Sequence, residues 1–386
     1  MIKSFGALYQ GQIDMEGVGD DGTPANDRRY SNDRLTGVFG TATEVAQTAD
    51  ELGYDTLWMA EHHFQHEGYE CISNIILLAT HLAGITKRLR FGCGFNVLPA
   101  WHPLRLAEDF ATADVLTGGR VIFGIGRGYH TREVETFGAP MLDSDANRAL
   151  FEEQFEIIMK AFESKAFAHR GKNYTIPPIV PYRGYDLEEI TLVPRPINRP
   201  VEVWQPLVSG SPRGIDFMVR NGISGVISAS AETFVDRWIH AYRDAAAGYG
   251  RDLQLGQNIA LGYRFYIAET TEKAMSEARK YFEEHAKFAA PLGMLRYSDQ
   301  QMNAIGSAEG QSLDDRPGIE EGVKTRVWLC GPPEDFVAYL KEVQSRYPGL
   351  EHVILTAAMG MDRAVIKEQL HAFAQDVMPH FGGGGS

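Results

Sequence analysis

Short apolar segments alternate with stretches of helical spacing along nearly the whole chain. The segments that read as strands are residues 3–9, 54–60, 90–98, 120–125, 201–208, 224–228, 257–268 and 352–356. Strands that alternate regularly with helices are typical of a parallel sheet with crossover helices. Eight such pairs favour a closed (β/α)8 TIM barrel over an open doubly wound sheet. The predicted fold class is therefore α/β, with residues 1–381 as a single domain.

Long irregular segments interrupt this pattern, and we expect insertions after strands 1, 4 and 7. Residues 10–35 are polar, and residues 165–200 are rich in proline. Residues 291–324 follow a helical stretch, lack periodicity and are predicted to form an active-site lid. Disorder is the alternative for these loops. Residues 382–386 read GGGGS, which is the composition of a linker or an appended tail.

Composition excludes several kinds of partner. The chain has 37 Lys and Arg against 51 Asp and Glu, a net charge of −14, which argues against nucleic acid and anionic membranes. Cys71, Cys93 and Cys330 are too far apart for a CxxC metal site and too few for a disulfide framework. No apolar segment is long enough to span a bilayer, and no signal peptide is evident. A cytoplasmic protein is expected.

The motif Glu61-His62-His63-Phe64 closes the second predicted strand. Carboxyl ends of barrel strands are where sites are built, so His62 is a candidate acid, base or ligand. A histidine that merely ends the strand is the alternative. Neighbouring residues on a strand point to opposite faces, so His62 and His63 are not expected to line one pocket unless the strand has already ended. This argues against a dinuclear metal site, and no metal is predicted.

Glycine-rich turns follow the fourth and fifth predicted strands. In Gly124-Ile-Gly126-Arg127-Gly128, the arginine can bind a phosphate bidentately. Ser209-Gly210-Ser211-Pro212-Arg213-Gly214 opens a helix, where free N–H groups and a hydroxyl can bind a phosphate dianion. An ordinary tight turn and an ordinary N-cap serine are the alternatives. The GxGxG spacing lacks the third glycine of a dinucleotide fingerprint.

Several motifs occur in a characteristic order: WMAEHH, RLRFG, LPAWHPLRLAEDFATADVLTGGR, FGIGRGYHTREVETFG, NRAL, VSGSPRG and DVMPHF. In this order the chain resembles the bacterial luciferase-like flavin-dependent monooxygenases, and closely the luciferase alpha subunit. That family is a (β/α)8 barrel that binds reduced FMN from a separate reductase. It reacts the flavin with O2 and oxygenates an organic substrate through a flavin peroxide.

The resemblance implies roles for particular residues. His62 matches the catalytic histidine, and Arg127 and Arg148 match phosphate-binding arginines. Ser211, with the backbone of Gly210 and Gly214, completes the implied phosphate site.

Asn96 lies near the expected position of the flavin ring. It can hydrogen-bond the ring or its oxygen adduct, or it can cap the strand end. Glu61, His63 and His102 are expected to be structural.

The chain also departs from the luciferase pattern. Gly126 stands where luciferase has a reactive cysteine, and Ala229 stands where it has a tryptophan. Long-chain aldehyde specificity is therefore not expected. Phe5, Tyr129 and Trp204 suggest a mostly apolar substrate.

The expected function is that of a two-component, FMNH2-dependent monooxygenase and homodimer, served by a separate NAD(P)H:flavin reductase. An F420-dependent oxidoreductase of the same barrel superfamily and a flavin-binding, non-catalytic relative are the alternatives. The EHHF motif and the paired Arg127 and Arg148 favour FMN. The presence of His62 argues against a loss of chemistry.

Overall fold

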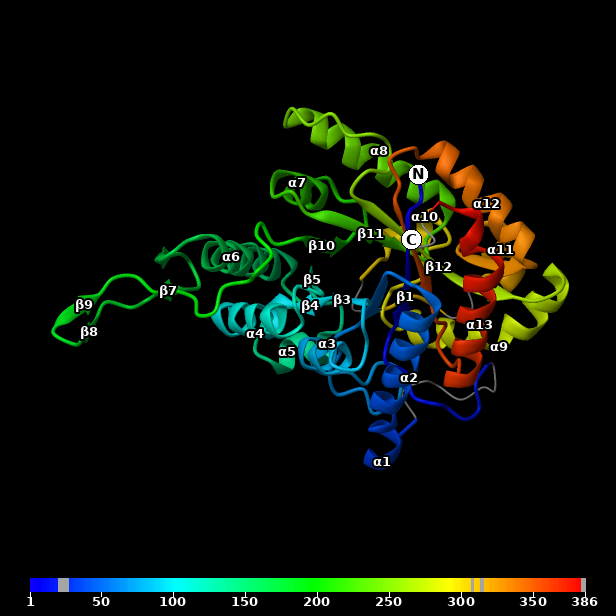
Figure 1. Ribbon diagram of the computed structural model, residues 1–386, viewed down its shortest axis with the longest axis horizontal. Coiled ribbons are helices and arrows are strands. Elements are labelled where there is room, and N and C mark those ends of the chain that lie inside the picture. Colours follow the sequence, from blue (N-terminus) through cyan, green and yellow to red (C-terminus); the bar gives the residue numbers. More distant parts are fainter. Residues whose placement is uncertain (20–27, 307–308, 313–315, 383–386) are drawn as a thin grey trace.

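Eight parallel strands close into a barrel in the computed structural model, which describes residues 1–19, 28–306, 309–312 and 316–382 (Figure 1). The barrel strands are β1 (Ser4–Tyr9), β2 (Thr56–Met59), β3 (Arg90–Cys93), β5 (Val121–Gly126), β10 (Val203–Pro206), β11 (Ser224–Ser228), β12 (Ile259–Ile267) and β14 (His352–Thr356). Pairing of β5 with β10 and of β14 with β1 completes the ring. The predicted TIM barrel is confirmed.

Helices surround the barrel on its outside (Figure 1). They are α2 (Gly37–Leu52), α3 (Ile75–Ala83), α4 (Pro103–Leu116), α6 (Ser144–Glu163), α7 (Pro212–Arg220), α8 (Glu232–Gly248), α9 (Thr271–Ala289), α12 (Pro333–Arg346) and α13 (Arg363–Asp376). Local sequence explains their ends. Gly53 stops α2 with φ 83°, Pro103 begins α4, and the Asp362 carboxylate caps α13 by accepting from the Val365 N–H.

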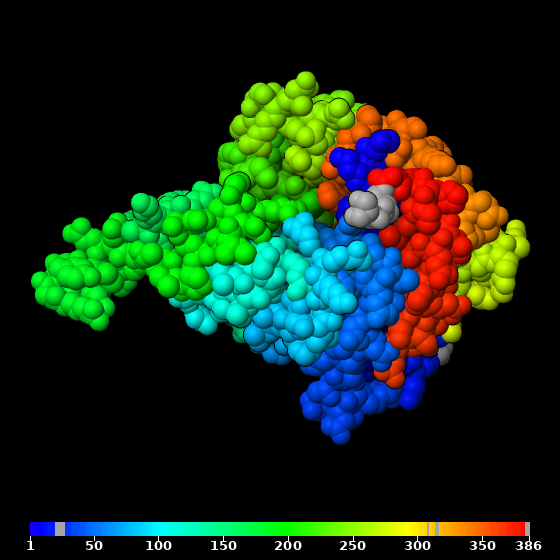
Figure 2. Space-filling view, in the orientation of Figure 1, coloured from blue at the N-terminus to red at the C-terminus, as the bar shows by residue number. Residues whose placement is uncertain are grey.

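Insertions interrupt the repeat where irregular sequence predicts them. After β1 comes a long loop with α1 (Asn32–Leu35), and after β5 comes α5 (Thr131–Thr136). The proline-rich segment forms an arm of two hairpins, β6 (His169–Arg170) with β7 (Thr175–Ile176) and β8 (Val180–Tyr182) with β9 (Tyr185–Leu187). This arm projects from the body of the molecule (Figure 2).

The segment after β12 is more ordered than its weak periodicity suggests. Beyond α9 it contains α10 (Asp299–Asn303), α11 (Ile319–Lys324) and β13 (Trp328–Gly331), which pairs with β12. Leu295 and Ile319 are buried, so part of the predicted lid packs on the barrel. Residues 383–386 of the predicted tail lie outside the described residues.

Alternate residues of the barrel strands fill its interior. The inner cluster consists of Trp58, Ile122, Trp204, Val226, Ala260 and Ile354, with Leu8 and Phe95 packed against it. Two residues expected in a substrate pocket are therefore elsewhere. Trp204 belongs to this inner core, and Phe5 points outward, with its ring 5.5 Å from that of Phe373. In a barrel both faces of a strand are buried, so an apolar residue does not reveal its direction.

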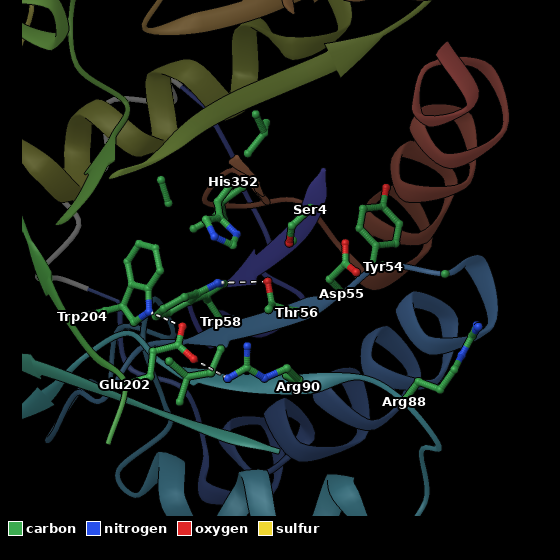
Figure 3. A pocket seen from close by; sticks show the side chains of 16 residues that line it. Ser4, Tyr54, Asp55, Thr56, Trp58, Arg88, Arg90, Glu202, Trp204 and His352 are labelled. Carbon is green, nitrogen blue, oxygen red and sulfur yellow. Dashed lines mark hydrogen bonds and ion pairs between the residues drawn. The ribbon is translucent and has the colours of Figure 1, made fainter. Parts of the chain in front are cut away.

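A cavity of about 300 Å³ lies at the amino-terminal end of the barrel (Figure 3). The first residues of the strands line it, including Ser4, Thr56, Arg90 and His352. The Arg90 guanidinium lies 2.6 Å from a Glu202 carboxylate oxygen, and the Trp204 indole N–H donates to the other oxygen at 2.7 Å. Arg90, Glu202 and Trp204 are thus paired with one another, as expected of the end of a TIM barrel that carries stability rather than catalysis.

Two short elements complete the fold. Strand β4 (Asn96–Val97) pairs with β5, and 3₁₀ turns occur at Leu98–Ala100 and Met378–His380. All three cysteines are free. Among the described residues, no helix is both long and apolar enough to cross a membrane.

Candidate active site

His62 lies at the carboxyl end of the barrel, in the loop that follows β2. It stands four residues after the inner residue Trp58, and its side chain is only 6% exposed. Its backbone N–H donates to the Ile72 carbonyl at 2.9 Å, which ties the two ends of this loop together. The imidazole is thus held in a buried position at the end of the barrel where catalytic side chains gather.

Two carboxylates flank the His62 ring. Nδ1 lies 3.2 Å from both oxygens of Glu133, and Nε2 lies 3.4 Å from Glu70. The Tyr129 hydroxyl lies 3.1 Å from Nε2 and donates to Glu70 at 3.2 Å. Glu133 also accepts from the His63 N–H at 3.0 Å and from the Gln65 amide at 2.9 Å. The cluster is therefore tightly positioned.

The carboxylates set the protonation of His62. Burial alone lowers its pKa, but the charges of Glu70 and Glu133 outweigh burial and raise the pKa to about 9. In turn, burial raises the pKa of Glu133, but the His62 cation outweighs it and lowers that pKa to about 2. At neutral pH the ring is an imidazolium, which can donate a hydrogen bond or a proton.

His63 occupies a different environment from His62. Its Nε2 lies 3.2 Å from Glu61, and its ring packs 4.7 Å from that of Phe137. Glu61 also accepts from the Trp101 indole N–H at 2.8 Å. The two histidines therefore do not line one pocket, and because both lie in the loop after β2, their contacts and not strand alternation separate them. His102 accepts from the Leu104 N–H at 3.3 Å as the N-cap of α4.

Three side chains of types that can bind a metal meet in this cluster. They are His62, Glu70 and His130, and each offers one atom within 4.8 Å of those of the other two. His130 Nε2 lies 3.2 Å from Glu70, a hydrogen-bonding distance. The absence of a metal stays a prediction from sequence.

Three guanidinium groups gather on the loops after β5 and β10. Arg127 follows β5, Arg148 lies near the start of α6, and Arg213 lies in the first turn of α7. Burial, and then the charges of Arg148 and Arg213, lower the pKa of Arg127 to about 10. Arg127 donates to the Asn147 amide oxygen at 3.2 Å. Because the charges of Arg148 and Arg213 both act on Arg127, an anion bound between the three guanidinium groups would be stabilised.

The loop before α7 has the small residues that such an anion needs. A side chain on Gly210, at φ 59°, would place its Cβ 2.1 Å from the Trp238 ring. The Ser211 hydroxyl accepts from the Gly214 N–H at 3.3 Å, so Ser211 is the N-cap of α7. That capping bond leaves the hydroxyl hydrogen available to donate.

Asn96 is fully buried in β4. Its side-chain N–H donates to the Gly124 carbonyl at 2.9 Å, and its Oδ1 has no partner among the described residues. The amide therefore anchors the strand end while its oxygen remains available.

Sequence reasoning missed several members of this site. Glu70 and His130 lie in the loops after β2 and β5, and Glu133 lies in the short helix α5, where no periodicity distinguishes them. Arg213 stands inside the Ser209–Gly214 turn, where the sequence predicts phosphate binding by Gly210, Ser211 and Gly214 only. Charged residues in polar loops become candidates only when the fold shows that they are buried.

Residues 22–348 match the family model described as luciferase-like monooxygenase. The chain belongs to this family. The predicted family resemblance is thus confirmed over most of the chain.

Curated relatives include named monooxygenases. The chain is 24% identical to 4-hydroxyprotoasukamycin monooxygenase from Streptomyces nodosus subsp. asukaensis, over 88% of this chain and 86% of that protein. It is 23% identical to the oxygenase component of the flavin-dependent trigonelline monooxygenase from Acinetobacter baylyi, over 89% and 90%. An uncharacterized protein, y4vJ of Sinorhizobium fredii, is 35% identical, but the match spans only 36% of this chain and 39% of that protein.

Solved structures share the fold. The oxygenating constituent of 3,6-diketocamphane monooxygenase from Pseudomonas putida, in complex with FMN, has a TM-score of 0.73 at 19% identity, and the match covers 98% of both chains. The F420-dependent tetrahydromethanopterin reductase from Methanopyrus kandleri has a TM-score of 0.65 at 17% identity, covering 99% of this chain and 100% of that one.

Proposed function

We propose that this protein is the oxygenase component of a two-component monooxygenase. It takes reduced FMN from a separate NAD(P)H:flavin reductase and uses O2 to oxygenate a small organic substrate. The family supports a flavin-dependent oxygenase. The Acinetobacter relative is named as an oxygenase component, and the Pseudomonas structure contains FMN.

The cluster of Arg127, Arg148 and Arg213 carries this proposal. Three cations at the carboxyl end of a barrel, beside a helix N-terminus, are suited to a phosphate dianion. The Ser211 hydroxyl, with the N–H groups at the start of α7, would bind the same phosphate. The flavin ring would then extend toward Asn96 and His62.

The residues around the ring would manage protons and water. Bound reduced flavin supplies the electrons that activate O2. Near it, the His62 imidazolium offers a proton at Nε2, and Glu70 and Tyr129 keep that nitrogen in place. The described part of the predicted lid, residues 291–306, 309–312 and 316–324, would exclude water from the site, and residues 307–308 and 313–315 lie outside the described residues.

Flavin titrations under anaerobic conditions test the cofactor. Reduced FMN should bind more tightly than reduced riboflavin, which lacks the phosphate, by roughly ten- to a hundredfold. Arg148→Ala should reduce that preference, while His63→Ala should keep it. Tighter binding of F420 than of FMN would favour hydride transfer without oxygen as the function.

The separate reductase is tested by cofactor consumption. The purified protein with FMN and O2 should oxidise almost no NADH, and addition of a flavin reductase should start product formation. Rapid NADH oxidation without a reductase would contradict a two-component system.

We also propose that the protein is a homodimer. The β8–β9 hairpin projects from the body of the molecule (Figure 2), and Tyr182, Tyr185 and the adjoining Ile179 are exposed. An exposed apolar arm of this kind favours association with another surface. Light scattering should give the mass of a dimer, and Ile179→Lys with Tyr185→Lys should shift it toward the monomer.

A further inference from the structure

Three basic side chains are buried at the carboxyl end of the barrel without an anionic partner. Arg264 is 5% exposed, Arg296 9% and His285 6%. The Nε atoms of both arginines and Nδ1 of His285 have no hydrogen-bond partner among the described residues. No carboxylate in the described part of the chain forms an ion pair with either arginine. These groups are distinct from the arginines of the proposed phosphate site.

The fold brings these side chains together from separate elements. Arg264 stands on β12 four residues after the inner residue Ala260, so strand alternation directs it into the barrel. Its register partner on β14 is Thr356, whose buried hydroxyl also lacks a described partner. Arg296 follows α9, and its carbonyl accepts from the Ala231 N–H at 3.1 Å, next to the end of β11.

This group of basic residues adjoins the His62 cluster. The Phe288 ring lies 6.0 Å from that of His285 on one side and 6.2 Å from that of His130 on the other. The charges of Arg264 and Arg296 both act on the Tyr297 hydroxyl, and that of Arg296 on Tyr129. Arg296 is therefore close enough for its charge to act on Tyr129, whose hydroxyl lies 3.1 Å from His62 Nε2.

The nearest acidic side chains are already engaged. Glu70 accepts from Tyr129 and pairs with His130, and Glu284 pairs with Arg28 and accepts from Tyr69 at 2.5 Å. Burial lowers the pKa of both Arg264 and Arg296 to about 10. Each arginine still carries its charge at neutral pH. Buried cations without a counterion destabilise a folded protein. An anion that enters the site would relieve this cost.

We propose that the substrate carries a carboxylate, which Arg264 and Arg296 bind beside His62. The planar fork of a guanidinium matches a carboxylate with two parallel hydrogen bonds. The surrounding rings of Tyr129, Phe288 and Tyr297 suit an apolar or aromatic body attached to it. This inference rests on the proposed monooxygenase function, because it assigns the substrate class of that same site.

Matched ligands test the charge requirement directly. FMN-loaded protein is titrated with benzoate, with the neutral isostere benzamide and with benzenesulfonate. Benzoate should bind best, by roughly tenfold or more over benzamide. Arg264→Met and Arg296→Met should each remove this preference. Arg90→Met is the matched control, since Arg90 is paired at the opposite end of the barrel, and it should keep the preference.

Thermal unfolding separates a binding role from a structural one. Without ligand, Arg264→Met should unfold at a temperature equal to or above that of the wild type, because it removes an unpaired buried charge. Benzoate should raise the unfolding temperature of the wild type but not of this variant. A lower unfolding temperature for Arg264→Met, with benzoate binding retained, would assign the arginine a structural role and overturn the proposal.

Other outcomes distinguish the two levels of inference. Equal binding of benzoate and benzamide, or tighter binding of benzenesulfonate, would overturn the carboxylate assignment while leaving the flavin proposal intact. Loss of affinity for reduced FMN in Arg264→Met would show that the arginine contributes to flavin binding. This result would also overturn the carboxylate assignment. If wild-type protein bound no FMN but still preferred benzoate, the proposed function would fail and the anion site would stand.

Discussion

At the amino-terminal end of the barrel Arg90 lies 2.6 Å from Glu202, whereas at the carboxyl end Arg264 and Arg296 are buried with no described carboxylate within ion-pairing distance. Both ends contain polar side chains that point into the same barrel. At the first, the Trp58 and Trp204 indoles also donate to Thr56 and Glu202. At the second, several buried polar atoms lack described partners.

The difference shows which polar groups raise the free energy of unfolding and which lower it. Paired polar groups stabilise the folded state whether or not a ligand is present. Unpaired buried cations are destabilising, so their presence points to a ligand that completes them. The experiments below change one end at a time and compare the effect on turnover with the effect on stability.

The largest expected effect is that of His62→Gln. General acid–base groups contribute about 10²–10⁴-fold, so turnover should fall by that order. Glutamine retains some hydrogen bonding to Glu133, whereas alanine would remove every polar contact that His62 makes with the two buried carboxylates and would also destabilise the fold. Coupled assays with reductase should show product falling and hydrogen peroxide rising. His63→Ala is the control and should keep wild-type turnover. Wild-type turnover in His62→Gln would contradict the assignment of His62 as the proton donor.

The next effect is a loss of flavin affinity in Arg127→Ala. A charge-assisted bond to phosphate is worth about 1.5–3 kcal/mol, or roughly ten- to a hundredfold in affinity. Arg148→Ala and Arg213→Ala should act in the same direction. Reduced riboflavin should bind all variants alike, because it carries no phosphate. Unchanged FMN affinity in all three variants would mean that the phosphate binds elsewhere.

The pH dependence of stability should reveal the His62 ion cluster. The pKa of His62 rises from 6.5 in the unfolded chain to about 9 in the folded protein. Its contribution is therefore fully present below pH 6.5 and is lost as pH rises through 9. The difference in unfolding free energy between wild type and His62→Gln should shrink across this window. A constant difference would show that His62 is neutral in the folded protein.

Much of this fold follows from the sequence alone. The strands are buried runs between turn-forming residues, and Gly53 and Pro103 mark helix ends through backbone geometry that depends on few neighbours. Gly124 differs, because it lies within β5 and a Cβ there would fall 1.6 Å from the carbonyl oxygen of Cys93 on the neighbouring strand, whereas the signals at Gly53 and Pro103 are local. Local signals of this kind are readable without a structure.

The site is less accessible because it depends on contacts between distant segments. Glu133 becomes a partner of His62 only when loops 71 residues apart meet. Arg264 lies in a segment that reads as an apolar strand, and nothing local shows that its charge is buried and unpaired. From sequence, Trp204 suggests an apolar substrate pocket, but its position on the strand puts it in the inner core.

A small effect is expected at the amino-terminal end for Glu202→Gln. The pair with Arg90 is partly exposed, with side chains 38% and 43% accessible, and such pairs contribute about 0–1 kcal/mol. The unfolding free energy should fall by that amount, and turnover and FMN affinity should stay at wild-type values. A large loss of turnover would show that the two ends are coupled and would break the contrast between them.

Removal of metal ions should change neither turnover nor stability. His62, Glu70 and His130 resemble a ligand set, but a metal would have to displace the proton that the charges of Glu70 and Glu133 hold on His62. Glu70 lies 3.4 Å from His62 and 3.2 Å from His130, so its two oxygens already have hydrogen-bonding partners without a metal. Dialysis against EDTA should therefore leave turnover and unfolding temperature unchanged, and elemental analysis should find no stoichiometric metal. Zinc or iron at one equivalent, lost together with activity and restored by the metal, would replace the proton-donor role of His62 with that of a metal ligand.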